Sequence, residues 1–520
     1  MRHGLIAGGL VALAGCASVG PEEALAPAAV PPGWAAVSEG MSGAPVAADW
    51  LEELADPAVT ALAAEAIAYN NDLAATGARV RAALAQARIQ RGQLLPTLGV
   101  GLGGNSQFSS GGVQQFEDPQ TGQIVFVDVP GSSQDQYSTT FSVQWDLDIW
   151  GRILDGTRAA YADAAAQELD YAAAALSIAG GTAQTYYGLV EARLQRELAE
   201  RDVETGEANL RIIERRYERG LSSSLDVRLA RASLAQSRAQ LIAREQAERE
   251  TARNLEVLVG RYPAAALAAP GVLPDVDALS ARNAAMIGLG DPAALLFRRP
   301  DVLSSELALK AAGLRVSEAR KALLPSLSVN ARATDNFDNS GDFFETLFDP
   351  DDVFATMAAN LFQPIFQGGR IKANIAAQRA QQEAAVYRYA QTALNAFREV
   401  EDAVAADAFL AAQLEARRLA FEEAEAAEEL SERQYLSGTT NIFDLISAQQ
   451  RRIANESQFI AASRARLVNR VDLYLALGAP FSVPVFERAG ADRFTPPARD
   501  PALPNPRTLA RAPADAESRP

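Results

Sequence analysis

The side chains that most often carry out nucleophilic, acid–base or metal chemistry are almost absent from this chain of 520 residues. It contains one histidine, His3, and one cysteine, Cys16. Zinc sites built on His or Cys, Ser-His-Asp triads and Cys-His pairs all need these side chains. Both lie in a segment with the features of a processed leader, so such sites are excluded from the mature chain. We expect no enzyme, no cofactor and no metal centre. Carboxylate chemistry stays open in principle, but no pair of carboxylates stands out from the charged helix faces.

The single cysteine could instead be a site of lipid attachment. Arg2 precedes an apolar run over residues 5–13 that is too short to cross a bilayer as a helix. The sequence Leu-Ala-Gly-Cys at 13–16 resembles the lipobox of bacterial lipoproteins. The resemblance implies a signal peptide over 1–15, cleavage before Cys16 and a diacylglycerol on its sulfur; the alternative is a plain signal peptide with an incidental cysteine. Ala17 stands where lipoproteins retained in the inner membrane tend to carry aspartate, so the resemblance points to the outer membrane.

Two aspartates each stand three residues after a polar residue, the pairs being Ser223 with Asp226 and Asn441 with Asp444. This spacing is typical of a helix start, where the carboxylate lies near the positive end of the helix dipole. Gly220 and Gly438 precede the two pairs and are placed to cap the preceding helices in the left-handed conformation. Each stretch is therefore predicted to be a tight turn between two helices.

Three further patterns carry no chemistry. The spacing Gly99, Gly101, Gly104 fits a dinucleotide fingerprint, but no helix follows it. The acidic stretch 335–352 lacks the spacing of an EF-hand and is interpreted as a solvated loop. Lys and Arg total 48 against 65 Asp and Glu, a net charge of −17, which argues against a nucleic-acid partner.

These features belong to a unit that occurs twice. Five residues recur 218 positions later: Gly151, Tyr217, Gly220, Asp226 and Gly260 reappear as Gly369, Tyr435, Gly438, Asp444 and Gly478. Upstream, Asp72 and Leu95-Pro96 reappear 229 positions later. The copies therefore differ by 11 residues between Pro96 and Gly151. A repeat of this length predicts two fused copies rather than the three domains that length alone suggests.

Long helices dominate each copy. The first is expected over 56–95, ended by Pro96. Two rods of 65 to 70 residues follow the glycines at 151 and 369 and end at Gly220 and Gly438, each about 100 Å long. Return helices are expected over 223–260 and 441–478. Along the first rod a narrow apolar stripe runs from Val190 to Tyr217, which suits coiled-coil contacts with neighbouring helices. The uncharged stretch 171–190 is too polar to be a membrane span.

Strict alternation of apolar and polar residues follows each Leu-Pro and predicts strands with two different faces. Three strands are expected around 98–103, 141–149 and 326–334, and a fourth, which alternates less clearly, around 354–366. A sheet on a soluble core would show the same alternation. Runs of nine to eleven residues with Ser, Gln, Asp and Arg on the polar face favour tilted transmembrane strands around a wet lumen.

Two copies of helix, strand, strand, helix, helix behind a lipobox resemble the TolC-type outer-membrane efflux proteins, most closely their lipoprotein branch of the OprM and NodT kind. The most specific pieces are the Leu-Pro turns, the Gly-Gly-Arg at 368–370 and the tip sequence YLSGTTNIFD at 435–444. The resemblance implies a trimeric duct, which works with an inner-membrane pump of the resistance-nodulation-division type and a periplasmic adaptor (membrane fusion) protein. It implies that Asp226 and Asp444 line the periplasmic entrance and that Tyr435 belongs to the closing contacts. Thr440 and Ser447 stand where TolC has an arginine and a second aspartate, so fewer ionic links are expected to close the tip.

The number of strands per chain also predicts a trimer. Four strands cannot close a barrel, and open edges are not tolerated in lipid. Two chains would give a barrel of eight strands, and side chains would fill its interior. Three chains would give twelve strands and leave an opening. The expected fold is thus mixed, all-α plus transmembrane β. It has four strands per chain in a 12-stranded trimeric barrel, continued by a long periplasmic α-helical barrel.

The expected segments are a signal peptide (1–15), a lipid-anchored tether (16–55), a first repeat (56–261), a linker (262–290), a second repeat (291–480) and a C-terminal segment with a disordered tail (481–520). The linker is expected to pack with the N- and C-terminal segments. The predicted function is the outer-membrane exit duct of a tripartite efflux pump that passively conducts small molecules. A protein-secretion duct and a periplasmic coiled-coil scaffold stay open as alternatives; the scaffold leaves the four amphipathic strands unexplained.

Overall fold

A computed structural model of the chain describes residues 33–36, 50–54, 56–117, 119–120, 122–276, 289–338 and 353–479. Cys16, most of the acidic stretch 335–352 and the segment 481–520 lie outside these residues. The chain divides into two compact units. The helical unit comprises residues 1–81, 165–307 and 386–520, and the sheet unit comprises 82–164 and 308–385. Several helices run from one unit into the other.

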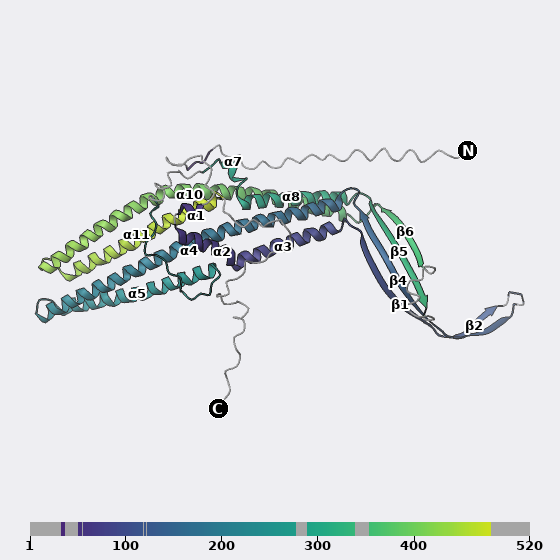
Figure 1. Ribbon diagram of the computed structural model, residues 1–520, viewed down its shortest axis with the longest axis horizontal. Helices are drawn as coiled ribbons and strands as arrows, with labels where there is room; N and C mark the ends of the chain where they lie inside the picture. Colours follow the sequence, from purple (N-terminus) through teal and green to yellow (C-terminus); the bar gives the residue numbers. More distant parts are fainter. Residues whose placement is uncertain are drawn as a thin grey trace, which may run out of the picture. The chain divides into compact units, whose positions relative to one another are not determined.

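The sheet unit contains a four-stranded antiparallel sheet in the order β1-β4-β5-β6 (Figure 1). Its strands are β1 (Thr97–Ser109), β4 (Ser132–Leu147), β5 (Ser326–Asp338) and β6 (Val353–Phe362). Leu98, Val143, Ala331 and Met357 form one register row. Because side chains alternate along each strand, the register gives one face that is mainly apolar in all four strands. The other face carries polar residues and glycines, interrupted in β6 by Phe354, Ala358 and Phe362. The predicted two-faced strands are confirmed.

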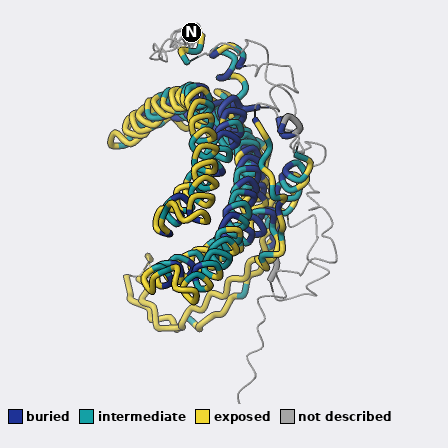
Figure 2. The backbone as a smooth tube through the Cα atoms, turned by 90° about the vertical axis from the view of Figure 1, so that its left-hand side faces the viewer, coloured by how far each residue is buried: buried dark blue, intermediate teal, exposed yellow. Residues whose placement is uncertain are grey.

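The strand lengths differ from those expected. β1, β4 and β5 contain 13, 16 and 13 residues rather than nine to eleven, and β6 ends at Phe362 rather than at 366. In the single chain β1 and β6 are exposed along their whole length (Figure 2). Leu98 and Met357 are each 79% exposed. A sheet whose apolar face is this open cannot rest on a core of its own chain.

The segment 106–136 lies between the first two predicted strands, where the sequence predicted no further strand. After β1 it forms a separate hairpin of β2 (Gly112–Glu117) and β3 (Ile124–Val129). The run Ile-Val-Phe-Val-Asp-Val in β3 has high strand propensity. The glycines and glutamines around it hid this signal.

The first predicted helix, 56–95, is in fact two helices, α2 (Pro57–Tyr69) and α3 (Asn71–Gly92). Asn70 separates them with an extended backbone, φ −65° and ψ 125°. Its Oδ1 accepts the N–H groups of Asp72 and Leu73 at 2.9 and 3.0 Å, which caps α3. Its Nδ2 donates to the carbonyl of Leu258 at 2.9 Å. Asn70 thus separates α2 from α3, caps the start of α3 and contacts the end of α5.

Arg299 occupies the position of Asn70 in the second repeat, between α7 (Pro292–Leu295) and α8 (Pro300–Lys321). It donates to the carbonyl of Ala476 at 3.0 Å, as Asn70 does to the equivalent residue. It also pairs with Asp301 and Glu399, each at 2.7 Å. Burial raises the pKa of Asp301, but hydrogen bonds and attraction from Arg299 outweigh it and hold that pKa below its ordinary value. The same backbone contact is made by an amide in one repeat and by a charged side chain in the other.

The long helices follow the sequence-based expectation at both ends. They are α4 (Arg152–Glu218), α5 (Ser224–Leu258), α10 (Arg370–Ser437) and α11 (Ile442–Ala476). The stripe on α4 is largely buried, with Val190, Leu198 and Ile213 at most 2% exposed. In the described part of the chain, no helix combines the length and the apolar character needed to cross a membrane.

The main core of the helical unit joins segments that are distant in sequence. Trp50 in α1 (Trp50–Glu53) stacks on Tyr474 of α11 with ring centroids 5.6 Å apart. Ala269 and Val276 of the linker belong to the same buried cluster. The linker therefore packs with the N-terminal segment, as expected from the sequence.

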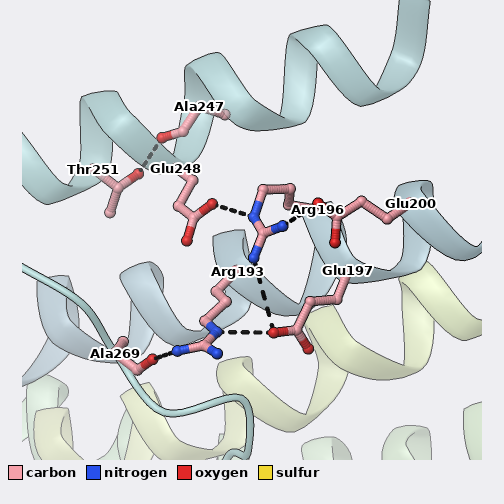
Figure 3. Close-up of polar contacts among 8 residues, drawn as sticks. All are labelled: Arg193, Arg196, Glu197, Glu200, Ala247, Glu248, Thr251 and Ala269. Carbon is pink, nitrogen blue, oxygen red and sulfur yellow. Dashed lines mark hydrogen bonds and ion pairs between the residues drawn. The ribbon is translucent and has the colours of Figure 1, made fainter. Parts of the chain in front are cut away.

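Arginine side chains of α4 also contact the linker and α5, through a hydrogen bond and an ion pair respectively (Figure 3). Arg196 of α4 donates to Glu248 of α5 at 2.5 Å and also pairs with Glu200 one turn further along α4. Arg193 donates to the carbonyl of Ala269 in the linker. Charged residues on α4 thus add polar contacts to two neighbours that its apolar stripe also packs against.

Candidate functional site at the helix tips

The first hairpin tip reverses the chain between α4 and α5. Gly220 has φ +72°, and the N–H of Leu221 donates to the carbonyl of Arg216 at 2.8 Å, which closes the end of α4. Ser223 Oγ then accepts the N–H of Asp226 at 3.2 Å, and the Asp226 carboxylate accepts the N–H of Ser223 at 2.8 Å. This reciprocal pair is a capping box. Within one chain the Asp226 carboxylate therefore holds the start of α5.

The second tip is built alike but not identically. Gly438 has φ +78°. Asn441 Oδ1 accepts the N–H of Asp444 at 3.0 Å, whereas the Asp444 carboxylate accepts the hydroxyl proton of Thr440 at 2.6 Å. The structure thus brings Thr440 and Asp444 together, and the Asp444 carboxylate remains exposed to solvent.

Tyr435 joins the two hairpins. Its side chain is 6% exposed and packs in a cluster with Ile213 of α4 and Val227 of α5. The guanidinium of Arg216 lies 5.1 Å from the centre of its ring, within the range of a cation–π contact. Tyr217, the equivalent residue in the first repeat, is 49% exposed. Sequence reasoning missed Arg216; the 218-residue repeat pointed to Tyr435 but not to its neighbours.

The sequence-predicted site residues are thus brought together only in part. Thr440 contacts Asp444, and Asp226 contacts its own cap, while Tyr435 lies in an apolar cluster and not against either carboxylate. Among the described residues, no group of three or more His, Cys, Asp or Glu side chains could hold a metal ion. The tips are built for helix reversal and for packing between hairpins.

Two helix faces near the tips are left uncovered by the described part of the chain. The α5 seam consists of Leu225, Arg228, Ala232, Ala235, Ala239, Ile242, Gln246 and Arg249. The α10 seam consists of Phe409, Ala412, Ala416, Leu419, Glu423, Ala426, Leu430 and Arg433. Every residue of both seams is exposed, and both repeat at alternating spacings of three and four, the period of a coiled-coil contact.

The helix segments that carry these seams have opposite charge. Residues 225–249 of α5 contain five arginines and three carboxylates, whereas residues 409–433 of α10 contain seven carboxylates and three arginines. Part of this charge is unpaired within the described part of one chain: Arg228 and Arg244 on α5, and Glu423, Glu425, Glu429 and Glu432 on α10. The two faces are complementary in pattern and in sign.

Comparison with known proteins gives a consistent picture. The family model described as "Outer membrane efflux protein" matches residues 62–261 and 292–479. The chain is 29% identical to the pyoverdine export outer membrane protein OpmQ of Pseudomonas aeruginosa, over 86% of this chain and 91% of that protein. It is also 29% identical to the toluene efflux pump outer membrane protein TtgF of Pseudomonas putida, over 90% and 95%.

Solved structures share the fold. A membrane protein from Pseudomonas aeruginosa superposes with a TM-score of 0.71 at 27% identity, covering 85% of this chain and all of that chain. The Campylobacter jejuni CmeC outer membrane channel gives a TM-score of 0.73 at 23% identity, covering 85% and 89%. The duplicated arrangement of helices and strands is therefore that of outer-membrane channels.

Proposed function

The chain belongs to the outer membrane efflux protein family, and on that premise we propose that three copies form the exit duct of a tripartite efflux pump. The observation that carries the proposal is the four-stranded sheet with one apolar and one polar face and two unpaired edges, β1 and β6. In lipid these edges need partners, and three sheets supply twelve strands around a polar lumen. The family is one of channel-forming proteins and not of enzymes, and its place is the outer membrane.

The two seams support the same assembly. α5 runs away from the tips and α10 runs toward them, so copies with the same orientation set α5 of one copy antiparallel to α10 of the next. Small and apolar residues then meet along the seam, and arginines of α5 face carboxylates of α10. A ring of six hairpins closed in this way leaves a central passage.

The trimer is tested by placing a charge in the seam. Light scattering with correction for detergent is expected to give three chains per particle. Ile242→Glu places a carboxylate in the α5 seam opposite the acidic α10 and is expected to lower the temperature at which the trimer dissociates. Gln240→Glu adds the same negative charge at an exposed position of α5 outside the seam and is the matched control. A stable dimer or monomer of the unaltered chain in detergent, or equal effects of the two variants, would contradict this assembly.

We also propose that the mature chain begins at Cys16 and carries lipid there. Cys16→Ser is expected to remove the acyl mass while the protein still inserts into the outer membrane, since a closed barrel anchors far more strongly than a lipid group. Intact-mass measurement of the purified chain checks this. A mature chain that starts at another residue, without lipid, would end the idea.

The partners proposed are a periplasmic adaptor protein and an inner-membrane pump of the resistance-nodulation-division type. The relatives named for pyoverdine export and toluene efflux support small solutes as cargo. The two repeats, 56–261 and 291–480, would supply alternate hairpins of the duct. Asp226, Asp444, Thr440 and Tyr435 are proposed to form the periplasmic gate, supported by their place at the two tips and by the exposed carboxylate of Asp444.

A further inference from the structure

The polar face of the four-stranded sheet carries an arginine in the middle of β5. Arg332 is exposed and shares a register row with Gly99, Ser142 and Thr356. The two adjacent rows of this face contain Thr97, Gln144, Asn330 and Ala358 on one side and Gly101, Thr140, Thr334 and Phe354 on the other. None of these residues is acidic. The arginine therefore has hydroxyl, amide, glycine and two apolar neighbours, Ala358 and Phe354, in these rows, but no carboxylate.

Arg332 has no hydrogen-bond or ion-pair partner within the described ranges of the chain. Asp146 is the next acidic residue on this face toward the start of β5, in the row of Ser328. Four residues along a strand separate that row from Arg332, about 13 Å. Asp338 lies six residues away in the other direction, about 20 Å. No carboxylate of the described residues neutralises this guanidinium, in contrast to Arg299.

The surroundings of Arg332 leave room for a ligand. A polar hollow of about 540 Å³ on this face is lined by Arg332 together with Ser142, Gln144, Asn330 and Thr356. The strand β1 contributes glycines, and a side chain at Gly101 would meet nothing within 4 Å. Hydroxyl and amide groups beside an unpaired guanidinium are donors suited to an anion.

We propose that Arg332, one from each of three copies, forms a weak binding point for small oxyanions inside the barrel. The ligands are the carboxylate, sulfate or phosphate groups of solutes on their way out. The threefold axis places the three arginines at the same height, and rings of charged side chains set the ion preference of pores. The fork of N–H donors of each guanidinium matches the geometry of an oxyanion. The proposal rests on the proposed function, because only the closed trimer turns the polar face into a lumen.

Sulfate applied to the barrel side of single channels in planar bilayers tests the proposal. In the unaltered trimer, sulfate is expected to reduce the potassium chloride conductance in a saturable manner. Arg332→Gln is expected to weaken the apparent sulfate affinity about tenfold. Arg332→Lys keeps the charge but not the forked donors, and its sulfate affinity is expected to lie between those of the unaltered protein and Arg332→Gln. Because Arg332 has no partner among the residues that the structure describes, the melting temperature of the trimer is expected to stay unchanged in both variants.

The proposed duct and the proposed anion site are contradicted by different results. If reconstituted protein gives no channels at all, the proposed duct is wrong. If channels form and sulfate blocks Arg332→Gln as strongly as the unaltered protein, the duct stands and the anion site is wrong. Loss of sulfate sensitivity in Asp146→Asn but not in Arg332→Gln would also overturn it.

Discussion

Replacing Asp226 and Asp444 together with Ala is expected to raise the single-channel conductance of the trimer and to weaken its preference for cations. In the proposed trimer these aspartates would place six carboxylates around one constriction, where fixed negative charge concentrates cations and excludes anions. The change also removes the bond from Thr440 to Asp444 and half of the capping box at Ser223. Conductance and reversal potential in a potassium chloride gradient across a planar bilayer measure the effect.

The double variant Asp226→Asn with Asp444→Asn separates charge from capping. Asparagine keeps an oxygen that can accept the Ser223 N–H and the Thr440 hydroxyl, so the helix starts are retained. It is expected to weaken cation preference as the Ala variant does, with an unchanged melting temperature. The Ala variant is expected to lose about 0.3–1 kcal/mol per helix start, the contribution of a carboxylate near a helix N-terminus. If both variants keep the cation preference and only the Ala variant melts earlier, the aspartates only cap helices and their role in the gate is dropped.

Glu256→Ala is expected to be the most destabilising single substitution proposed for the helical unit. The Glu256 side chain is 2% exposed and accepts the N–H groups of Ala265, Ala266 and Leu267 at 2.7, 2.6 and 3.1 Å. Its removal leaves three N–H groups of the linker without an acceptor, at a cost of about 1–3 kcal/mol for each one that stays buried. We expect a clearly lowered melting temperature and cleavage of the linker by added protease.

Two further variants control for charge and for helix position. Glu256→Gln keeps one oxygen acceptor and turns an N–H donor toward the linker amides, so an intermediate loss is expected. Glu250→Ala lies on the exposed side of the same helix, where the carboxylate bonds only Gln246. It is expected to change little. Equal melting temperatures and equal protease resistance in Glu256→Ala and Glu250→Ala would contradict the anchoring role.

The sequence predicted the parts of the fold that depend on neighbouring residues. Gly220 and Gly438 mark the tips because a left-handed turn and a following cap are decided within about six residues. The four strands were predictable from alternation with a period of two. The break at Asn70 was not, because its amide is held by the carbonyl of Leu258, which lies 188 residues away in sequence.

The candidate site was predictable to a lesser degree. The repeat offset located Tyr435, Asp226 and Asp444, but the cluster that buries Tyr435 includes Ile213, Val227 and Ala230 of the other repeat. The apolar stripe of α4 was visible in sequence, yet which helix faces remain uncovered depends on how the hairpins pack. The seams of α5 and α10 therefore emerge only from the burial of individual residues in three dimensions.

Duplication within one gene sets how a mutation is distributed in the assembled duct. A ring of six hairpins made from six separate copies of one repeat would receive every substitution six times. In the proposed trimer a substitution would arise three times, at alternate positions, and the other three hairpins would keep their residues. Asn70 and Arg299 show the difference: one repeat carries a charge at a shared backbone contact and the other a neutral amide. Contacts between hairpins of one chain and contacts between hairpins of different chains can therefore change independently. In a ring of six identical units they could not.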